Sequence, residues 1–118
     1  MTLVDTSVWI DHLRRPEPKL TELLEVGAVL CHPLVIEELA CGSLADRASL
    51  LRLLSALPPA PLAEHAEVLG LIERESLHGT GLGAIDAHLL ASARLGRMRL
   101  WSKDAALVRA AKRLGLAP

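Results

Sequence analysis

The sequence predicts an α/β domain in which helices flank a largely parallel sheet, and three observations support this prediction. Short apolar segments of strand type alternate along the chain with longer segments of helical periodicity. No hairpin signal joins neighbouring strand segments, so the connections are expected to pass through helices and leave the strands parallel. The chain has 118 residues and is 51% hydrophobic, which suits one core, so residues 1–118 are predicted to form a single domain.

The first half of the chain is predicted to contain two strands and four helices. Apolar segments of strand type and helical stripes alternate, and Pro33 stands at the favoured first position of a helix. Asp46 can cap a further helix. The expected elements are a strand at residues 2–4, a helix from Thr6 or Ser7 to Pro16, a helix at 19–25, a strand at 28–31, a helix from Pro33 to Gly42 and a helix from Asp46 to Leu54.

The second half is predicted to contain two long helices, a strand and a last helix. Three prolines make residues 57–62 a connector or at best a short edge strand. A helix at 64–77, a glycine-containing turn and a helix from about Ile85 follow. The expected last strand is 98–101, and Ser102 is expected to cap a helix that ends at Gly115.

Charge is distributed unevenly along the chain. The formal net charge of −1 argues against binding a polyanion through overall electrostatics. Residues 94–113 nevertheless carry seven basic side chains and one acidic one, a local charge of +6, which leaves −7 for the rest. This basic segment is either a solvated helix face or a surface that meets phosphates. With no Phe or Tyr and two Trp, the chain offers no broad platform for stacking bases.

The cysteines and the N-terminus point to a reducing compartment. Cys31 and Cys41 are expected to be buried thiols, because no secretory signal accompanies them. Asp5 and Asp11 lie where a signal peptide would be apolar, and no apolar run is long enough to span a bilayer. No Cys and His residues have the spacing of zinc ligands. We therefore expect a soluble, cytoplasmic protein without a zinc site.

Acidic residues are predicted at one edge of the sheet. Ligands of parallel α/β sheets bind beyond the carboxyl ends of the strands. Asp5 ends the first strand, Asp104 follows the last one, and Asp86 starts a helix after the glycine-containing turn. Asp86 and Asp104 lie where a carboxylate stabilises a helix N-terminus, so capping remains an alternative for both. Asp5 interrupts an apolar strand, so its charge needs a partner, a proton or a cation.

Helix geometry distinguishes the neighbours Glu37 and Glu38, which follow the middle strand. At 100° per residue, the apolar residues around them define the buried direction of their helix. Glu38 lies about 85° from that direction and Glu37 about 175°. Glu38 therefore borders the buried side and is the better candidate for a site.

Carboxylates that converge repel one another, and a hard divalent cation such as Mg²⁺ or Mn²⁺ relieves that repulsion. A cation held in this way activates water and neutralises the charge that builds on a phosphate during in-line displacement. If the acids converge, the sequence therefore predicts nuclease chemistry.

Four segments carry these acids in a recognisable order. They are Val4-Asp5-Thr6-Ser7-Val8-Trp9-Ile10, Glu38-Leu39-Ala40-Cys41-Gly42, Asp86-Ala87-His88-Leu89-Leu90-Ala91 and Leu100-Trp101-Ser102-Lys103-Asp104. Together they resemble the PIN-domain family, and especially its VapC-type toxins, over nearly the whole chain. The first segment is the most specific. The resemblance implies a PIN-like fold with a central, mostly parallel sheet of four to five strands flanked by helices.

The resemblance also implies roles for individual residues. The residues that match the four catalytic and metal-binding acids of the family are Asp5, Glu38, Asp86 and Asp104, in that order. Thr6 matches a hydroxyl residue that often supports the first acid, and Ser102 stands where the family usually has Thr or Ser. The chain departs from the family at Trp101, where a smaller aliphatic residue is usual, so the packing there is expected to differ.

The implied activity is that of a metal-dependent endoribonuclease, the toxin of a type II toxin–antitoxin system, with Mg²⁺ or Mn²⁺ as cofactor. The implied partners are RNA, a cognate VapB-type antitoxin and a second copy in a homodimer. Such antitoxins insert an arginine or lysine among the acids. The basic segment then becomes an RNA track, with Arg94, Arg97, Arg99 and Lys103 as the candidate contacts.

Two alternatives remain at this point. The chain could be a catalytically silent PIN-fold binding module that acts through a partner. It could also be a receiver-like phosphoacceptor domain, since Asp5 ends the first strand and Lys103 follows the last. The second alternative is weaker, because no aspartate ends a middle strand.

Overall fold

Strand β1 (Thr2–Val4) lies at the centre of a three-stranded parallel sheet in the computed structural model, which describes residues 1–118. Its neighbours are β2 (Val29–Leu30) on one side and β3 (Arg99–Trp101) on the other. All three strands run in the same direction, so their carboxyl ends lie at one edge of the sheet. The predicted parallel α/β architecture is confirmed.

The expected count of four to five strands is wrong, because the sheet has three. Residues 57–62 run beside the end of β2 but form only an isolated bridge between Cys31 and Pro59. The Cys31 N–H donates to the Pro58 carbonyl at 3.0 Å, and the Ala60 N–H donates to the Cys31 carbonyl at 2.9 Å. The prolines of this segment have no N–H group to donate, so the pairing does not grow into a strand.

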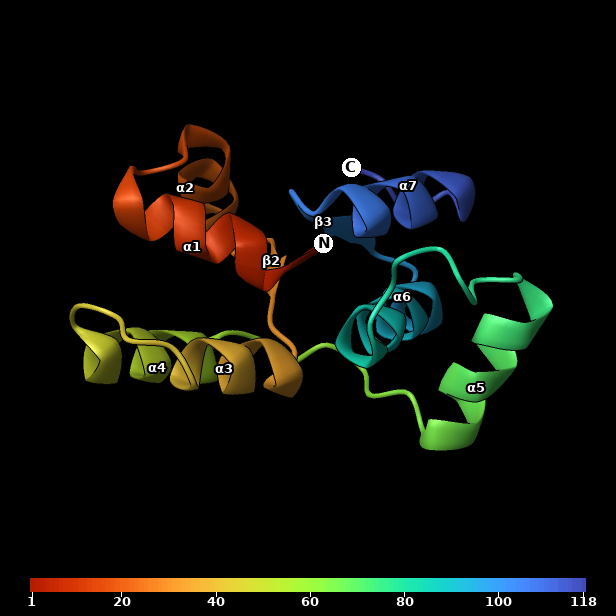
Figure 1. Ribbon diagram of the computed structural model, residues 1–118. Helices are drawn as coiled ribbons and strands as arrows, with labels where there is room; N and C mark the ends of the chain where they lie inside the picture. Colours follow the sequence, from red (N-terminus) through yellow and green to blue (C-terminus); the bar gives the residue numbers. More distant parts are fainter.

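Seven helices connect and cover the strands, and each was expected within a few residues. They are α1 (Thr6–Arg14), α2 (Pro18–Glu25), α3 (Pro33–Ala40), α4 (Arg47–Ala56), α5 (His65–Arg74), α6 (Ala84–Gly96) and α7 (Ala105–Arg113). In the view of Figure 1, α2 and α7 lie above the strands, α1 lies to their left, and α3 to α6 lie below them. No helix combines the length and the apolar character that crossing a bilayer requires.

The core is almost wholly aliphatic, and β1 and α6 lie within it. Leu3 and Val4 on β1 and Leu89 and Leu90 on α6 have no exposed surface. Trp9 is the only aromatic side chain that is fully buried. Full burial of a Leu or Val side chain contributes about 1.5–3 kcal/mol to the free energy of unfolding. This packing fixes the position of the end of β1 relative to the first turn of α6.

A buried histidine fixes the start of α3, the helix that carries Glu38. The backbone N–H of Leu34 donates to His32 Nδ1 at 3.0 Å, and Pro33 occupies the first turn, where its missing N–H costs nothing. Burial lowers the pKa of His32, and the nearby His88 lowers it further. His32 is therefore neutral at physiological pH and carries its proton on Nε2.

The last helix begins differently from the prediction. Ser102 was expected as its cap, but the cap is Asp104, whose Oδ2 accepts the Leu107 N–H at 3.3 Å. The chain leaves β3 at Trp101 and runs three residues further before its backbone becomes helical at Ala105. Ser102 consequently stands at the strand end, where its hydroxyl is free for contacts across the sheet.

Both cysteines are free, and only one of them is buried as expected. Cys31 follows β2 inside the core, and burial raises the pKa of its thiol to about 11. Cys41 is exposed, because α3 ends at Ala40 and the chain turns into solvent there. The expectation of two buried thiols is therefore wrong for Cys41.

A thiol reagent at pH 8 is expected to modify Cys41 rapidly and to leave Cys31 unmodified in the folded protein. The thiolate is the reactive form, and a pKa of about 11 keeps Cys31 protonated at that pH. Intact-mass measurement should show one adduct on the native chain, two after unfolding, and none on native Cys41→Ser. Rapid addition of two adducts to the native chain would contradict this assignment.

Candidate active site

The adjacent carboxyl ends of β1 and β3 bring Asp5 and Ser102 together. Val4 pairs with Trp101 in the sheet, so the next residue of each strand emerges at the same edge. The Ser102 hydroxyl donates to Asp5 Oδ2 at 2.7 Å, and the Ser7 hydroxyl donates to the same oxygen at 2.8 Å. Asp5 is only 5% exposed, so the two donors replace part of its lost hydration. Its Oδ1 receives no hydrogen bond from the protein.

The two serine hydroxyls also tie Asp5 to the segment that enters α7. Ser7 Oγ accepts the Lys103 N–H at 2.9 Å, and Ser102 Oγ accepts the Asp104 N–H at 3.0 Å. The two Oγ atoms are 3.3 Å apart. One network thus fixes the end of β1, the start of α1 and the turn after β3.

Ser7 was not among the candidate site residues from the sequence. Asp5 occupies the N-cap position of α1, and its own side chain makes no capping bond. A hydroxyl two residues after a residue in that position lies in the first helical turn, close enough to donate back to it. The Asp-Thr-Ser order contains this signal, but no local pattern ranks Ser7 above Thr6.

Thr6 supports the second acid instead of the first. Its hydroxyl donates to Glu38 Oε1 at 2.6 Å, which joins α1 to α3. Glu37 and Glu38 are both exposed, and of the two only Glu38 has a side-chain partner. The structure therefore links Glu38, and not its neighbour, to the segment that begins with Asp5.

Asp86 lies in the first turn of α6, where its Oδ2 accepts the Gly83 N–H at 3.1 Å. Burial raises the pKa of Asp86, and the hydrogen bond from Gly83 opposes this effect. The charges of Asp5, Asp104 and Glu38 raise the pKa of Asp86 further. The fold thus places four carboxylates, which come from four separate segments, within electrostatic reach of one another.

Asp104 makes a capping hydrogen bond and also acts electrostatically on another acid of the cluster. Its side chain caps α7 through the Leu107 N–H, as the capping alternative required. Its charge also acts on Asp86. Asp86 bonds the entry to α6 in a similar way, so for both residues a capping role and a place in the acidic cluster coexist.

No basic side chain neutralises this cluster. The three ion pairs of the chain involve other acids: Arg94 with Glu75, and Lys103 with Asp11 and Glu17. The Lys103 ammonium lies 3.0 Å from the Asp11 carboxylate and 3.1 Å from that of Glu17. The lysine beside Asp104 in the sequence therefore leaves the four acids without a counter-charge.

The acids are not assembled as a ready set of metal ligands. No group of three or more Asp, Glu, His or Cys side chains lies close enough to hold a metal ion. The donors near one another are all carboxylate oxygens, the ligand type that Mg²⁺ and Mn²⁺ prefer. Their chemistry fits a hard cation that retains several of its waters and is held by one or two carboxylates directly.

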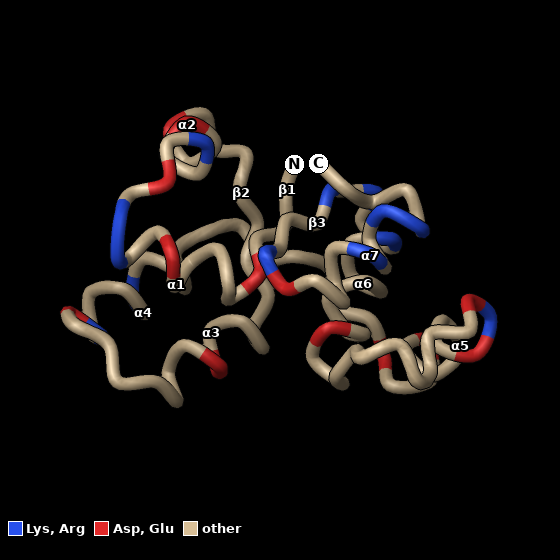
Figure 2. The backbone as a smooth tube through the Cα atoms, turned by 45° about the horizontal axis from the view of Figure 1, so that its top comes forward, with Lys and Arg blue, Asp and Glu red and all other residues tan.

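Three of the four predicted RNA contacts are engaged within the protein. Arg94 pairs with Glu75 at 2.9 Å, and Lys103 holds two carboxylates. The Arg99 guanidinium donates to the carbonyls of Gly115 and Ala117, at 3.3 Å each. Arg97 is exposed at the end of α6. Figure 2 shows that basic positions gather around α7 and the start of β3.

We expect Ser102→Ala to lower the free energy of unfolding by about 1–3 kcal/mol, because it removes a donor to the buried charge of Asp5 and the acceptor of a backbone N–H. Urea unfolding at pH 7 measures this loss. Ser43→Ala, at an exposed position without a side-chain partner, is the control and should change stability little. Equal effects of the two substitutions would show that the hydroxyl network does not stabilise the fold.

Comparisons with known proteins agree with this arrangement. The sequence profile of the PIN domain matches residues 2–113. Two proteins named Ribonuclease VapC32, from the CDC 1551 / Oshkosh and H37Rv strains of Mycobacterium tuberculosis, are each 52% identical to this chain over 118 residues. The alignment covers 99% of the chain and 95% of each relative. The match of fold, motif order and sequence shows that the chain belongs to the PIN domain family and is a relative of its VapC-type toxins.

Proposed function

We propose that this protein is a metal-dependent endoribonuclease and the toxin of a type II toxin–antitoxin system. The observation that carries the proposal is the gathering of Asp5, Glu38, Asp86 and Asp104 without a basic partner. Repulsion of this kind is unfavourable unless a cation offsets it. The relatives that match almost the whole chain are named ribonucleases, which makes RNA the proposed substrate.

Asp5, Glu38 and Asp86 are the residues that would hold Mg²⁺ or Mn²⁺, directly or through water. When bound, the cation supplies an activated water and neutralises charge on the scissile phosphate. Asp5 can offer Oδ1, because Ser7 and Ser102 engage only Oδ2. Thr6 restrains Glu38 by its hydrogen bond.

The remaining residues prepare the site. The Gly83 N–H restrains the Asp86 carboxylate at the start of α6. Asp104 completes the acidic pocket or orients the attacking water. The candidate RNA contacts from the sequence are Arg94, Arg97, Arg99 and Lys103, and the ion pairs of Arg94 and Lys103 must loosen if those side chains are to meet phosphates.

The proposed partners follow from the same site. A cognate VapB-type antitoxin would place an arginine or lysine among the four carboxylates, because such a side chain supplies the counter-charge that the chain itself lacks. The proposed assembly is a homodimer, and the proposed location is the cytoplasm.

One observation favours a second candidate, a catalytically silent PIN-fold module. The carboxylates do not form a ready set of three ligands. A silent module would bind its partner through this site without cleaving RNA. The two experiments below distinguish it from the nuclease.

Asp5→Asn is expected to abolish RNA cleavage, with a loss of at least about 100-fold, because it removes a ligand charge while preserving the side-chain shape. The assay follows the cleavage of labelled single-stranded and structured RNAs by the parent protein, Asp5→Asn and Glu37→Gln, purified in the same way. Glu37→Gln removes a neighbouring exposed carboxylate and should retain activity. Cleavage by Asp5→Asn at the parent's rate would exclude Asp5 from the site.

Metal binding can be measured without activity. We expect Mn²⁺ or Mg²⁺ to raise the thermal midpoint of the parent protein, by an amount that corresponds to about 2.7 kcal/mol when the ion is present at 100 times its Kd. EDTA should reverse the shift and stop cleavage. Asp5→Asn should show a much smaller shift and Glu37→Gln an unchanged one. The absence of any shift in the parent would favour the silent module.

A further inference from the structure

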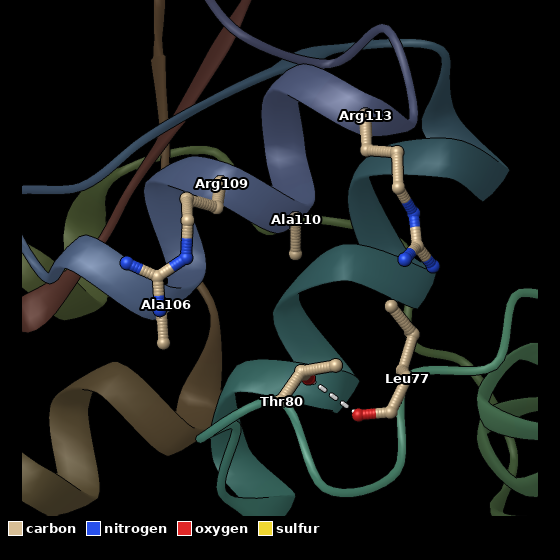
Figure 3. A pocket seen from close by; sticks show the side chains of 6 residues that line it. All are labelled: Leu77, Thr80, Ala106, Arg109, Ala110 and Arg113. Atoms are coloured by element: carbon tan, nitrogen blue, oxygen red, sulfur yellow. Dashed lines mark hydrogen bonds between the residues drawn. The ribbon is translucent and has the colours of Figure 1, made fainter.

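A cavity lined by two arginines lies beside α7, outside the acidic cluster. Its volume is about 230 Å³. One wall is a face of α7, and the other is the segment that leads from α5 toward α6 (Figure 3). The residues that line it are Leu77, Thr80, Ala106, Arg109, Ala110 and Arg113.

The lining contains positive charge and no carboxylate. Arg109 has neither a hydrogen-bond acceptor nor an ion-pair partner within the chain. The Arg113 guanidinium donates only to the backbone carbonyl of Glu75, which leaves its charge uncompensated. Figure 3 shows Arg109 near Ala106 at one end of the cavity and Arg113 above Leu77 at the other. This cavity therefore suits an anion.

Both walls of the cavity continue along the chain to acids of the cluster. α7 begins immediately after Asp104, and Arg109 lies five residues on, about 7.5 Å along the helix axis. The opposite wall continues to Gly81, whose backbone lies so close to Ala106 that an added Cβ would be 3.4 Å from the Ala106 Cβ. Two residues later Gly83 bonds Asp86. The approach of Gly81 to Ala106 therefore joins one end of the cavity to the segments that carry Asp86 and Asp104.

We propose that this cavity binds backbone phosphates of the RNA strand next to the phosphodiester that lies at the acids. The proposal rests on the proposed ribonuclease function and assigns a substrate subsite to it. Guanidinium groups bind phosphate oxygens in a bidentate manner. Arg109 and Arg113 are one helical turn apart, about 6 Å along the axis, on the face of α7 that lines the cavity. A row of anions along α7 matches this arrangement.

The proposal adds Arg109 and Arg113 to the candidate RNA contacts. Of the four candidates from the sequence, Arg94, Arg99 and Lys103 already have partners within the chain and only Arg97 has none. Arg109 also has none, and Arg113 has only a carbonyl. The lining also lacks aromatic side chains, so the subsite would read no bases. Phosphate contacts of this kind position a strand without selecting its sequence.

RNA binding by the double variant Arg109→Gln, Arg113→Gln tests the proposal. A fluorescein-labelled single-stranded RNA is titrated with Asp5→Asn protein in EDTA, with and without the double substitution, at several salt concentrations. We expect the affinity to fall at least tenfold, about the effect of losing charged hydrogen bonds. The dependence of log K on log salt should become shallower by about 1.4, or about 0.7 for each lost phosphate contact.

The matched control removes the same charge elsewhere. Lys19→Gln, Arg52→Gln changes exposed residues of α2 and α4 and should leave affinity and salt slope within about twofold of the parent, since distant charges are screened. If circular dichroism shows that the double variant is destabilised, the single variants Arg109→Gln and Arg113→Lys replace it in the titration. Arg109→Gln should weaken binding, and Arg113→Lys should retain the salt slope.

Competition distinguishes RNA backbone from other anions. Unlabelled RNA, inorganic phosphate and polyglutamate are each added to the complex with labelled RNA, at equal total charge. Unlabelled RNA should displace the labelled RNA at a far lower concentration than either of the other anions. An unchanged RNA affinity and slope in the double variant would overturn the proposal. The proposal would also be overturned if the double substitution weakened the binding of polyglutamate but not that of RNA. That result would assign the cavity to an acidic peptide.

The outcome is separable from that of the proposed function. Binding is measured with Asp5→Asn in EDTA, where no metal-dependent cleavage occurs. If the parent protein cleaves RNA, the double variant should raise KM and leave kcat within about twofold, because its contacts serve binding in the ground state and transition state alike. A loss of cleavage with unchanged RNA binding would overturn the subsite and leave the nuclease proposal intact.

Discussion

The buried carboxylate of Asp5 is the constraint around which this end of the molecule is organised. A charge at the end of an apolar strand is unfavourable unless donors replace its hydration, and the Ser7 and Ser102 hydroxyls do so from two different segments. Ser102 can reach Asp5 only because β1 and β3 are adjacent and parallel. The pairing of two short strands therefore determines where α1 starts, where the chain turns toward α7 and which oxygen of Asp5 stays free.

The helix N-termini give the acidic cluster a second source of support. Asp86 and Asp104 accept backbone N–H groups at the starts of α6 and α7, and helix N-termini favour negative charge. These contacts partly offset the mutual repulsion that, together with burial, raises the pKa of Asp86. Helix capping and a place in the acidic cluster are thus compatible for both residues. The same interactions stabilise the helices and hold the two carboxylates within electrostatic reach of Asp5 and Glu38.

The sequence predicted much of this arrangement, with failures of identifiable kinds. Helix periodicity separated Glu38 from Glu37, and the Thr6 hydrogen bond links Glu38 to the site segment. The expectations differ from the structure where a polar side chain has a choice of partners. The resemblance pairs Thr6 with the first acid, whereas Thr6 bonds Glu38. The local pattern makes Ser102 a helix cap, whereas Ser102 bonds Asp5. Both competing partners are distant in the sequence, so no local pattern could rank them.

The charge pattern of the sequence likewise did not reveal which side chains are partners in the fold. Counting located the basic segment at residues 94–113, but it could not tell which side chains have partners. Lys103 contacts Asp11 and Glu17 across the fold, whereas Arg109 and Arg113 border a cavity that exists only when α7 packs beside the turn after α5. Availability for a ligand depends on these long-range contacts.

The sequence by itself determined the alternation of strands and helices, the parallel sheet, the aliphatic core and the identity of the acids. Periodicity, turn residues and charges that interrupt apolar segments are all local properties of a chain. Only the tertiary structure decided the strand number, the partner of each hydroxyl and the proximity of the four carboxylates. Those features depend on which segments meet after folding. Pairing between residues nearly a hundred positions apart, such as Asp5 and Ser102, follows from sheet order, which no single segment encodes.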